Sequence, residues 1–472
     1  MNSKKCFLNP AIKCTSKPNI IKTRDDACPI CFIKENDCKY SLCEHHVGCS
    51  WAKQRQAFEE NILKERIEPW LTSLFQSEHF SLLAGAGLTT GICQIADKPA
   101  AGMPSVDFTI FQDEIKAEVK RTAMALERRE GNFEDYIRVA NELLAGLQII
   151  NHSDAERLRL EIEEKINSFT KAILQTERDL ATAEEEQKKN AFNCLVAFLM
   201  SFASRTGTRD RINIFTTNYD RLIEEAADLA GLHLLDRFVG KLSPVFRTSR
   251  LNLDLHYNPP GIRGEPRYLE GVARFTKLHG SLDWIQTGEL IRKIGLPFGA
   301  DDVSPYLNAP GLQGASKFNL MIYPNSAKDK ETAAYPYVEL FRDFSAAVCR
   351  PNSTVITYGY SFGDEHINRV LRDMLTIPST HLVVISYDDR LGRIHNFYKQ
   401  TAHVDQITLL LGAHIASIDI LTQRFLPKSA IDFATSRMSE ILQKRYAPYP
   451  PHTPKDPDGV EAILLSKGKN NA

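Results

Sequence analysis

The chain has 472 residues, a formal charge of −1 and a hydrophobic fraction of 43%. This length exceeds what one hydrophobic core usually supports, so we expect one large domain with additions, or two domains. The balanced charge gives no global reason to bind nucleic acid, although a local basic face stays open. The first residues contain no apolar signal region, and the longest apolar run, at 194–200, is too short to span a bilayer. We therefore expect a cytoplasmic protein with reduced thiols and no membrane contact.

Cysteines gather in the predicted leader at 1–50, which holds seven of the ten. In a reducing compartment such a cluster favours a metal over disulfides. The candidate ligands are Cys28, Cys31, Cys43, His46 and Cys49. The first two form a CxxC pair, and the last three offer two ways to make a second pair at the same spacing. Four such ligands suit a closed, structural zinc site. The alternative is a cysteine-rich leader without a metal.

A helical pattern follows at about 110–204. Apolar residues recur every three or four positions there, and charges of both signs cover the other faces. The clearest stripe consists of Leu158, Ile162, Ile166, Phe169 and Ile173. We expect a large helical insertion that packs by one face, and a contact with a partner or a second subunit is the alternative.

Short apolar runs alternate with loops and helices after residue 211. Their length and β-branched content suit buried strands of a parallel sheet. Together with the strand and glycine-rich turn at 80–91, they predict an α/β fold, a Rossmann-like doubly wound parallel sheet. We assign this domain to residues 51–400 and expect a helix and a flexible tail over 401–472.

Small or polar residues end each predicted strand. They are Gly85-Ala86-Gly87, Thr216-Thr217-Asn218, His279-Gly280-Ser281 and Gly359-Tyr360-Ser361. Ligands of doubly wound sheets bind outside the carboxyl ends of the strands, so we expect these groups to line one shared crevice. The glycine turn suits a phosphate held by backbone N–H groups. It is not a full dinucleotide fingerprint, because Thr90 stands where a glycine is needed, and no P-loop lysine follows.

In combination these segments resemble the sirtuin family. Residues 84–87 resemble its Gly-Ala-Gly nucleotide loop, and "TTNYD" at 216–220 resembles its Thr-Gln-Asn-Ile-Asp segment. "LHGS" at 278–281 resembles its histidine-glycine segment, and residues 358–368 resemble the loop that holds the adenosine end of NAD. The chain is more closely similar to prokaryotic sirtuin-like proteins of anti-phage defence, whose Asn/Glu-Asp-Tyr stretch is matched by "GNFEDYI" at 131–137.

Two departures separate the chain from the sirtuin deacylases. Their small zinc module with paired cysteines is missing, because Cys349 is the only cysteine between His279 and Gly359. Their Gly-Ile-Pro-Asp-Phe-Arg loop becomes at best "AGMPSVDF" at 101–108. The module helps to shape an acyl-lysine tunnel, which cleavage of NAD+ does not need. The resemblance therefore favours an NAD+ hydrolase that releases nicotinamide and ADP-ribose.

Cleavage of the bond between nicotinamide and ribose needs a bound pyrophosphate, a held ribose and a positioned nucleophile. We predict catalytic roles for Asn218, His279 and Asp220. The asparagine can fix a ribose hydroxyl or a water, the histidine is the natural general base, and the aspartate can accept from the nicotinamide carboxamide. The alternatives are that Asn218 and Asp220 only cap the next helix and that His279 is structural.

The candidate NAD-binding residues lie in the glycine turn, after the second strand and in the late loop. They are Gly85, Ala86, Gly87, Thr89, Thr217, Gly359 and Ser361. The resemblance further implies low basal activity, gated by a homo-oligomer or by a partner such as a HerA-type ATPase, with nucleic acid involved only indirectly. Two other functions stay open: a sensor that binds NAD or a nucleotide signal without turnover, and a protein deacylase or ADP-ribosyl transferase.

Overall fold

A mixed sheet of eleven strands forms the centre of the described part of the chain. The structure is a computed structural model that describes residues 18–23, 25–36, 39–43, 49–54, 56–102, 105–125, 131–203, 210–249, 254–257, 267–315, 320, 335–389 and 391–428. All of these except Lys428 lie in a first unit, Met1–Pro427. Most of the predicted C-terminal helix and tail therefore lies outside the described residues.

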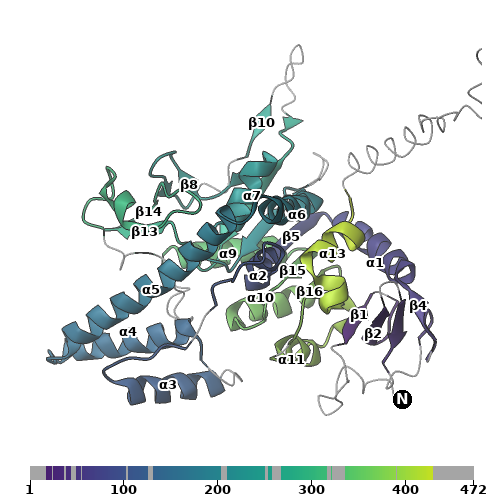
Figure 1. The fold of residues 1–472 in the computed structure, drawn as a ribbon, viewed down its shortest axis with the longest axis horizontal. Helices are drawn as coiled ribbons and strands as arrows, with labels where there is room; N and C mark the ends of the chain where they lie inside the picture. Colours follow the sequence, from purple (N-terminus) through teal and green to yellow (C-terminus); the bar gives the residue numbers. More distant parts are fainter. Residues whose placement is uncertain are drawn as a thin grey trace, which may run out of the picture. The chain divides into compact units, whose positions relative to one another are not determined.

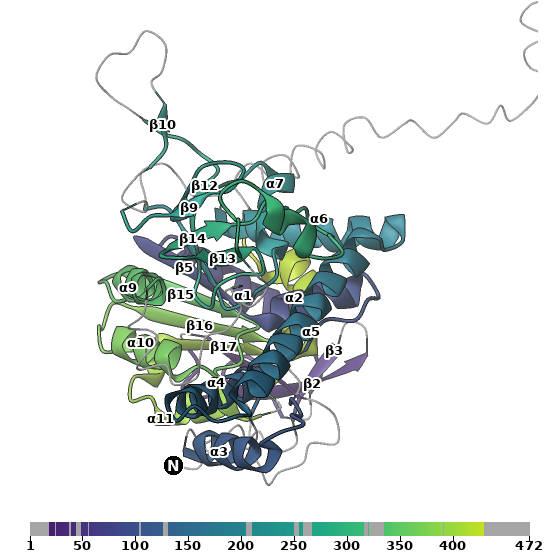
Figure 2. The ribbon, with the colours of Figure 1, turned by 90° about the vertical axis from the view of Figure 1, so that its left-hand side faces the viewer.

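Seven neighbouring strands of the sheet are parallel, and they confirm the doubly wound, Rossmann-like core that the sequence predicts. In chain order they are β5 (His79–Ala84), β6 (Asn213–Thr216), β7 (His233–Leu235), β12 (Val272–Lys277), β15 (Ser353–Tyr358), β16 (His381–Ser386) and β17 (Ile407–Leu411). In space their order is β17-β16-β15-β5-β6-β12-β7, and Figure 2 shows the part of it from β5 through β15 and β16 to β17. The chain therefore continues from β5 to β6 on one side and later returns to β15 on the other. The sheet continues past residue 400 into β17.

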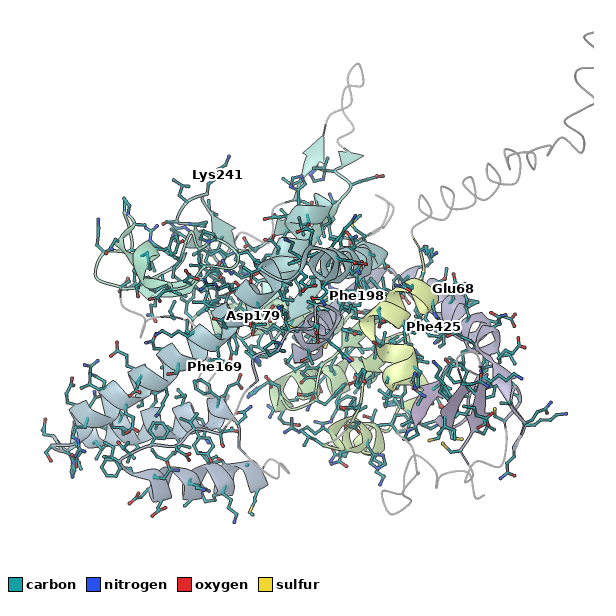
Figure 3. The ribbon with its side chains drawn as sticks, viewed as in Figure 1. Glu68, Phe169, Asp179, Phe198, Lys241 and Phe425 are labelled. Atoms are coloured by element: carbon teal, nitrogen blue, oxygen red, sulfur yellow. The ribbon has the colours of Figure 1, made fainter. Side chains whose placement is uncertain are left out.

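Alternate residues of the parallel strands pack into two separate cores, because successive side chains of a strand point to opposite faces. In β5, Leu82 belongs to one core and Leu83 to the other. The first core also holds Phe198 and Phe425, which Figure 3 labels. Its helices are α1 (Glu60–Phe75), α2 (Ala86–Ile95), α6 (Glu185–Ala203) and α7 (Leu222–Ala230), with α12 (Ala413–Ala416), α13 (Ile418–Ile420) and the π-helical turn η5 (Leu421–Phe425). The helices of the second core are α9 (Tyr337–Val348), α10 (Glu365–Leu375) and α11 (Arg393–Gln400).

No helix in the described ranges combines the length and the apolar character needed to cross a membrane.

The helical insertion packs in a third core, which it shares with apolar residues between Leu282 and Leu320. Its helices are α3 (Gln112–Ala125), α4 (Phe133–Ile149) and α5 (Ala155–Ala181), which lie side by side in Figures 1 and 2. All five members of the predicted α5 stripe are buried in it, and Phe169 stacks on Phe133 of α4 at 4.1 Å between ring centroids. Helix α6 lies within the predicted range of the insertion, but it packs in the first core of the main sheet.

Smaller strands complete the described fold outside the parallel strands. A four-stranded sheet has the order β13-β14-β9-β8, and a two-stranded sheet pairs β10 with β11. Their bounds are β8 (Phe238–Val239), β9 (Val245–Phe246), β10 (His256–Tyr257), β11 (Arg267–Tyr268), β13 (Trp284–Thr287) and β14 (Leu290–Lys293), and two 3-10 turns are η2 (Ser304–Asn308) and η4 (Val404–Gln406).

The described part of the N-terminal leader extends the main sheet. Its strands β1 (Asn19–Lys22), β2 (Ile30–Asn36) and β3 (Lys39–Leu42), with β4 (Phe58–Glu59) after them, are antiparallel, and β1 pairs with β17. The amide of Cys43, directly after β3, donates to the carbonyl of Cys31 in β2 at 3.0 Å, so the backbones of these two candidate ligands lie side by side. Among the described residues, no group of three or more His, Cys, Asp or Glu could hold a metal. His46 lies outside those residues, and the zinc site stays a prediction.

A half-buried histidine makes the stability of this sheet sensitive to acid. The Nε2 atom of His381, at the start of β16, lies 2.8 Å from the Thr408 hydroxyl, to which the Trp70 indole also donates at 2.9 Å. The hydroxyl has one proton and two lone pairs, so beside the indole it pairs with the neutral imidazole as donor or as acceptor, according to the tautomer. Burial, assisted by Lys22, lowers the pKa of His381 from 6.5 to about 3.

We expect acid to weaken the fold through His381. Its folded pKa lies below the unfolded value, so its contribution is fully present above about pH 6.5 and is lost as the pH falls toward 3. From pH 6.5 to 5 the loss is about 2 kcal/mol. Urea unfolding between pH 5 and 7 should show a flatter pH dependence for His381→Gln than for the wild-type protein. The exposed control His233→Gln should keep the wild-type slope. Equal slopes for His381→Gln and the wild-type protein would contradict this assignment.

Candidate functional site

The predicted site residues follow strands on both sides of the point where the strand order reverses. β5 pairs with β6 on one side and with β15 on the other, and all three run in the same direction. In doubly wound sheets this is the place where a crevice opens for ligands. The turns after these three strands therefore share one edge of the sheet.

Two glycine turns touch through their backbones at this edge. The amide of Gly85 donates to the carbonyl of Tyr358 at 2.9 Å, and that of Gly87 donates to the carbonyl of Gly359 at 3.0 Å. A Cβ on Gly359 would lie 2.6 Å from the Cα of Gly87, and Gly359 has φ of +59°. The structure thus explains the glycines by this close approach. The amides of Gly85 and Gly87, which we predicted to hold phosphate, therefore donate to backbone carbonyls of the protein itself.

Asn218 lies directly against the first glycine turn. Its Nδ2 atom donates to the carbonyl of Gly85 at 3.1 Å and to the hydroxyl of Thr89 at 3.0 Å. The preceding residue, Thr217, is tied to β5 by its amide, which donates to the carbonyl of Ala84 at 3.2 Å. Only 8% of Asn218 is exposed. The structure therefore brings together three residues that we predicted separately, from two different strand ends.

Thr89 extends this contact into a polar chain. Its hydroxyl accepts from Asn218 and donates to Oδ2 of Asp220 at 2.6 Å. The other carboxylate oxygen, Oδ1, accepts from the amide of Leu222 at 3.2 Å, at the start of α7. Asp220 lies one residue before the N-cap, Arg221, and accepts from the first amide of the helix while it also joins the site, so a structural role and a role in the site are compatible.

His279 follows β12, the neighbour of β6. The pair Lys277 and Thr216 is in register between these strands, and Asn218 and His279 each lie two residues further along. The Nε2 atom of His279 lies 2.8 Å from Oδ2 of Asp364, which caps α10 by accepting from the amide of His366. Only 5% of His279 is exposed. The imidazole is held by a carboxylate and does not lie beneath a purely aliphatic layer.

The late loop contributes its two predicted residues differently. Gly359 packs on the first glycine turn, whereas Ser361 is exposed. A Cβ on Gly363 would lie 3.3 Å from the hydroxyl of Ser361 and 2.6 Å from the guanidinium of Arg393. Ser361 and Arg393 therefore lie close together, on the surface side of this loop.

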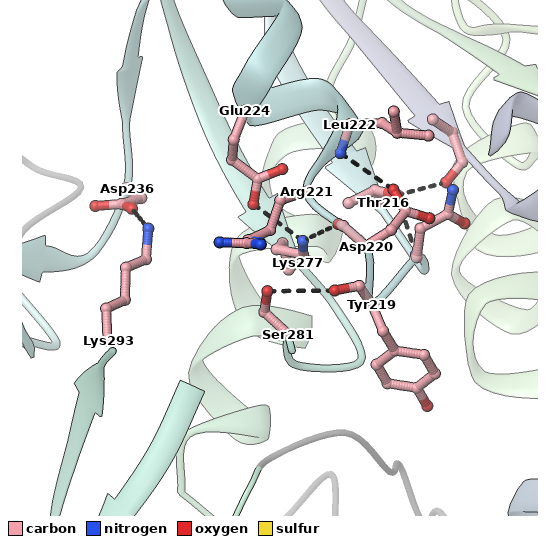
Figure 4. Close-up of polar contacts among 12 residues, drawn as sticks. Thr216, Tyr219, Asp220, Arg221, Leu222, Glu224, Asp236, Lys277, Ser281 and Lys293 are labelled. Carbon is pink, nitrogen blue, oxygen red and sulfur yellow. Dashed lines mark hydrogen bonds and ion pairs between the residues drawn. The ribbon is translucent and has the colours of Figure 1, made fainter. Parts of the chain in front are cut away.

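Buried charges hold the turn that carries Asn218 and Asp220 (Figure 4). Lys277 donates to the backbone carbonyl of Asp220 and to the carboxylate of Glu224, the latter at 2.9 Å. Arg221 forms a buried ion pair with Glu177 of α5. Burial raises the pKa of Glu224, while Lys277 opposes this shift. Removing one partner of such a pair would leave an uncompensated buried charge, so these contacts fix the turn.

The structure also shows site residues that we did not assign from the sequence. They are Glu134, Tyr219 and Asp364. Glu134 lies in the stretch at 131–137 and Asp364 in the stretch at 358–368, both noted for the resemblance. Neither spacing nor periodicity shows which carboxylate meets the imidazole, because these contacts join segments that are far apart in sequence.

Comparisons with known proteins identify a SIR2-like domain in part of the chain. Residues 212–406 match the family model described as "SIR2-like domain". A search of the curated proteins found no match. Among 47 matching chains of solved structures is one described as "The Structural basis of Sirtuin Substrate Affinity". It is 15% identical, covers 79% of this chain and 98% of its own, and has a TM-score of 0.30.

We expect the contact between the glycine turns to be required for stability. Gly359→Ala adds both a left-handed alanine and an overlap with Gly87, so it should lower the free energy of unfolding by more than about 3 kcal/mol. The matched control is Gly288→Ala, which has φ of +61° but no atom within 4 Å of the new carbon. It should cost about 1 kcal/mol. Urea unfolding measures both values, and equal losses would show that the close approach carries no cost.

Proposed function

We propose, from the SIR2-like domain at residues 212–406, that this protein is an NAD+ glycohydrolase. SIR2-like domains use NAD+ as a substrate, which supports the cofactor assignment. The observation that carries the proposal is the polar chain from Asn218 through Thr89 to Asp220, beside a glycine turn at the reversal point of the sheet. His279 follows the adjacent strand and supplies a base.

The reaction needs one bond broken and one formed at the anomeric carbon of the ribose. The bond from this carbon to the nicotinamide nitrogen breaks, and its electron pair leaves with neutral nicotinamide. A water oxygen bonds to the same carbon and gives its proton to His279, which leaves ADP-ribose as the second product. Asn218 has the donor and acceptor groups to orient the water or a ribose hydroxyl, and Asp220 can accept from the carboxamide.

Low activity in the resting protein follows from the burial of these groups. The amide of Asn218 and the ring of His279 both bind protein groups, and each is less than a tenth exposed. Substrate has to displace some of these contacts before it reaches them. This need agrees with a hydrolase that is opened by assembly or by a partner. We extend the proposal to anti-phage defence by NAD+ depletion, with a homo-oligomer or a HerA-type ATPase as the gate, on the strength of the resemblance.

We expect incubation with NAD+ alone to release nicotinamide and ADP-ribose. Asn218→Ala and His279→Ala should each reduce the rate at least about a hundredfold, the usual effect of losing an orienting group or a general base. The exposed controls Asn396→Ala and His233→Ala should keep it. Chromatography of the products, with the size of the protein measured in parallel, provides the readout.

Other outcomes would replace the proposal with a different function. Release that requires an acylated peptide would identify a deacylase. Binding of NAD+ without products would identify a sensor. Full turnover in both site variants would refute the roles given to Asn218 and His279.

A further inference from the structure

Both ring nitrogens of His279 face carboxylates. Nε2 lies 2.8 Å from Oδ2 of Asp364, and Nδ1 lies 3.9 Å from Oε1 of Glu134. All three residues are buried, with 5% of His279 and of Asp364 and 7% of Glu134 exposed. Electrostatic interactions are strong in such a setting, because little water screens them. The proposed reaction so far uses neither carboxylate.

The helical insertion places Glu134 at this position. Glu134 is the second residue of α4, whose start is set by a reciprocal capping box between Asn132 and Asp135. Phe133 stacks on Phe169 of α5, whose ring meets the ring of Tyr219 edge-on at 5.9 Å. Two helices of the insertion therefore pack against the residue that lies between Asn218 and Asp220 in the chain.

Tyr219 fixes the carboxylate itself. Its hydroxyl donates to Oε1 of Glu134 at 2.7 Å, the same oxygen that faces the imidazole. Burial, assisted by the neighbouring Glu134, raises the pKa of Tyr219, so the phenol keeps its proton and remains a donor. The carboxylate is thus oriented between a phenol and the ring of His279.

We propose that Glu134 is a positioning residue that acts through His279, and this inference rests on the proposed hydrolase. With Asp364 on Nε2, Nδ1 is the nitrogen left to receive a proton. When the imidazole takes that proton it becomes a cation, and a fixed carboxylate on the same side stabilises the charge as it develops. This contact makes the helical insertion part of the catalytic site.

Replacing Glu134 by glutamine keeps the shape of the side chain and removes its charge, so this variant separates an electrostatic role of Glu134 from a role in packing. Glu134→Gln should lower kcat at least about tenfold, with KM within about threefold of the wild-type value, because the lost interaction strengthens only in the transition state. Glu134→Asp, which keeps the charge, should recover part of the rate. Tyr219→Phe removes the hydrogen bond that orients this carboxylate and should lower kcat about fivefold.

A matched control exists within the insertion. Glu161 is also buried there, and it accepts from the amide and the hydroxyl of Thr109 at 2.5 and 3.0 Å. Glu161 has no role in the proposed reaction, so the Glu161→Gln variant should keep kcat within about twofold, even if this variant unfolds more easily. Wild-type kcat in Glu134→Gln, or an equal loss in Glu161→Gln, would overturn the proposal.

A second measurement does not depend on turnover. Proton–nitrogen NMR of the side chain of His279, identified by the signals that His279→Gln removes, reports the surroundings of both ring nitrogens. Glu134→Gln should shift these signals, and Glu161→Gln should leave them in place.

A wild-type protein that releases no nicotinamide would refute the proposed hydrolase, whereas unshifted His279 signals in Glu134→Gln would refute the role of Glu134. If Glu134→Gln does not fold, Tyr219→Phe provides the same two readouts.

Discussion

Two backbone turns at one edge of the sheet approach so closely that no side chain fits between them, and the site is built around this contact. Gly87 and Gly359 meet there, and the first turn donates two amides to the second. Since these turns follow the neighbouring strands β5 and β15, the contact determines where α2 begins and therefore where Thr89 stands. Thr89 then joins Asn218 to Asp220. The polar chain of the site is thus a consequence of backbone packing.

Burial explains why so many of these polar groups bind one another. A buried donor or acceptor without a partner is costly, so Asn218 uses the carbonyl of Gly85 and Lys277 uses that of Asp220. Such a network holds its geometry without a ligand. It also means that a substrate has to compete with the protein's own contacts, which connects the stability of the resting site to the low basal rate proposed for it.

The helical insertion contributes two charged residues to the surroundings of the candidate site. Arg221, directly after Asp220, pairs with Glu177 of α5, and Glu134 of α4 faces His279. Each contact places a charge from the insertion beside the turn or the base of the proposed reaction. A change in how these helices pack would therefore reach the site through both of these contacts.

The sequence by itself determined the features that depend on local geometry. Strand and helix periods follow from the backbone, so the parallel strands and the apolar stripe of α5 could be predicted from the spacing of apolar residues. Parallel strands also share one carboxyl edge, which is why Asn218, Asp220 and His279 could be proposed together.

Only the tertiary structure decided which groups meet. Asp364 reaches His279 across 85 positions, and the contact of Glu134 depends on how α4 packs on α5. The same limit holds for the leader, where cysteine spacing suggested a metal but could not reveal that β1 pairs with β17. Contacts of this kind arise from packing between distant segments, and no local pattern in the sequence encodes them.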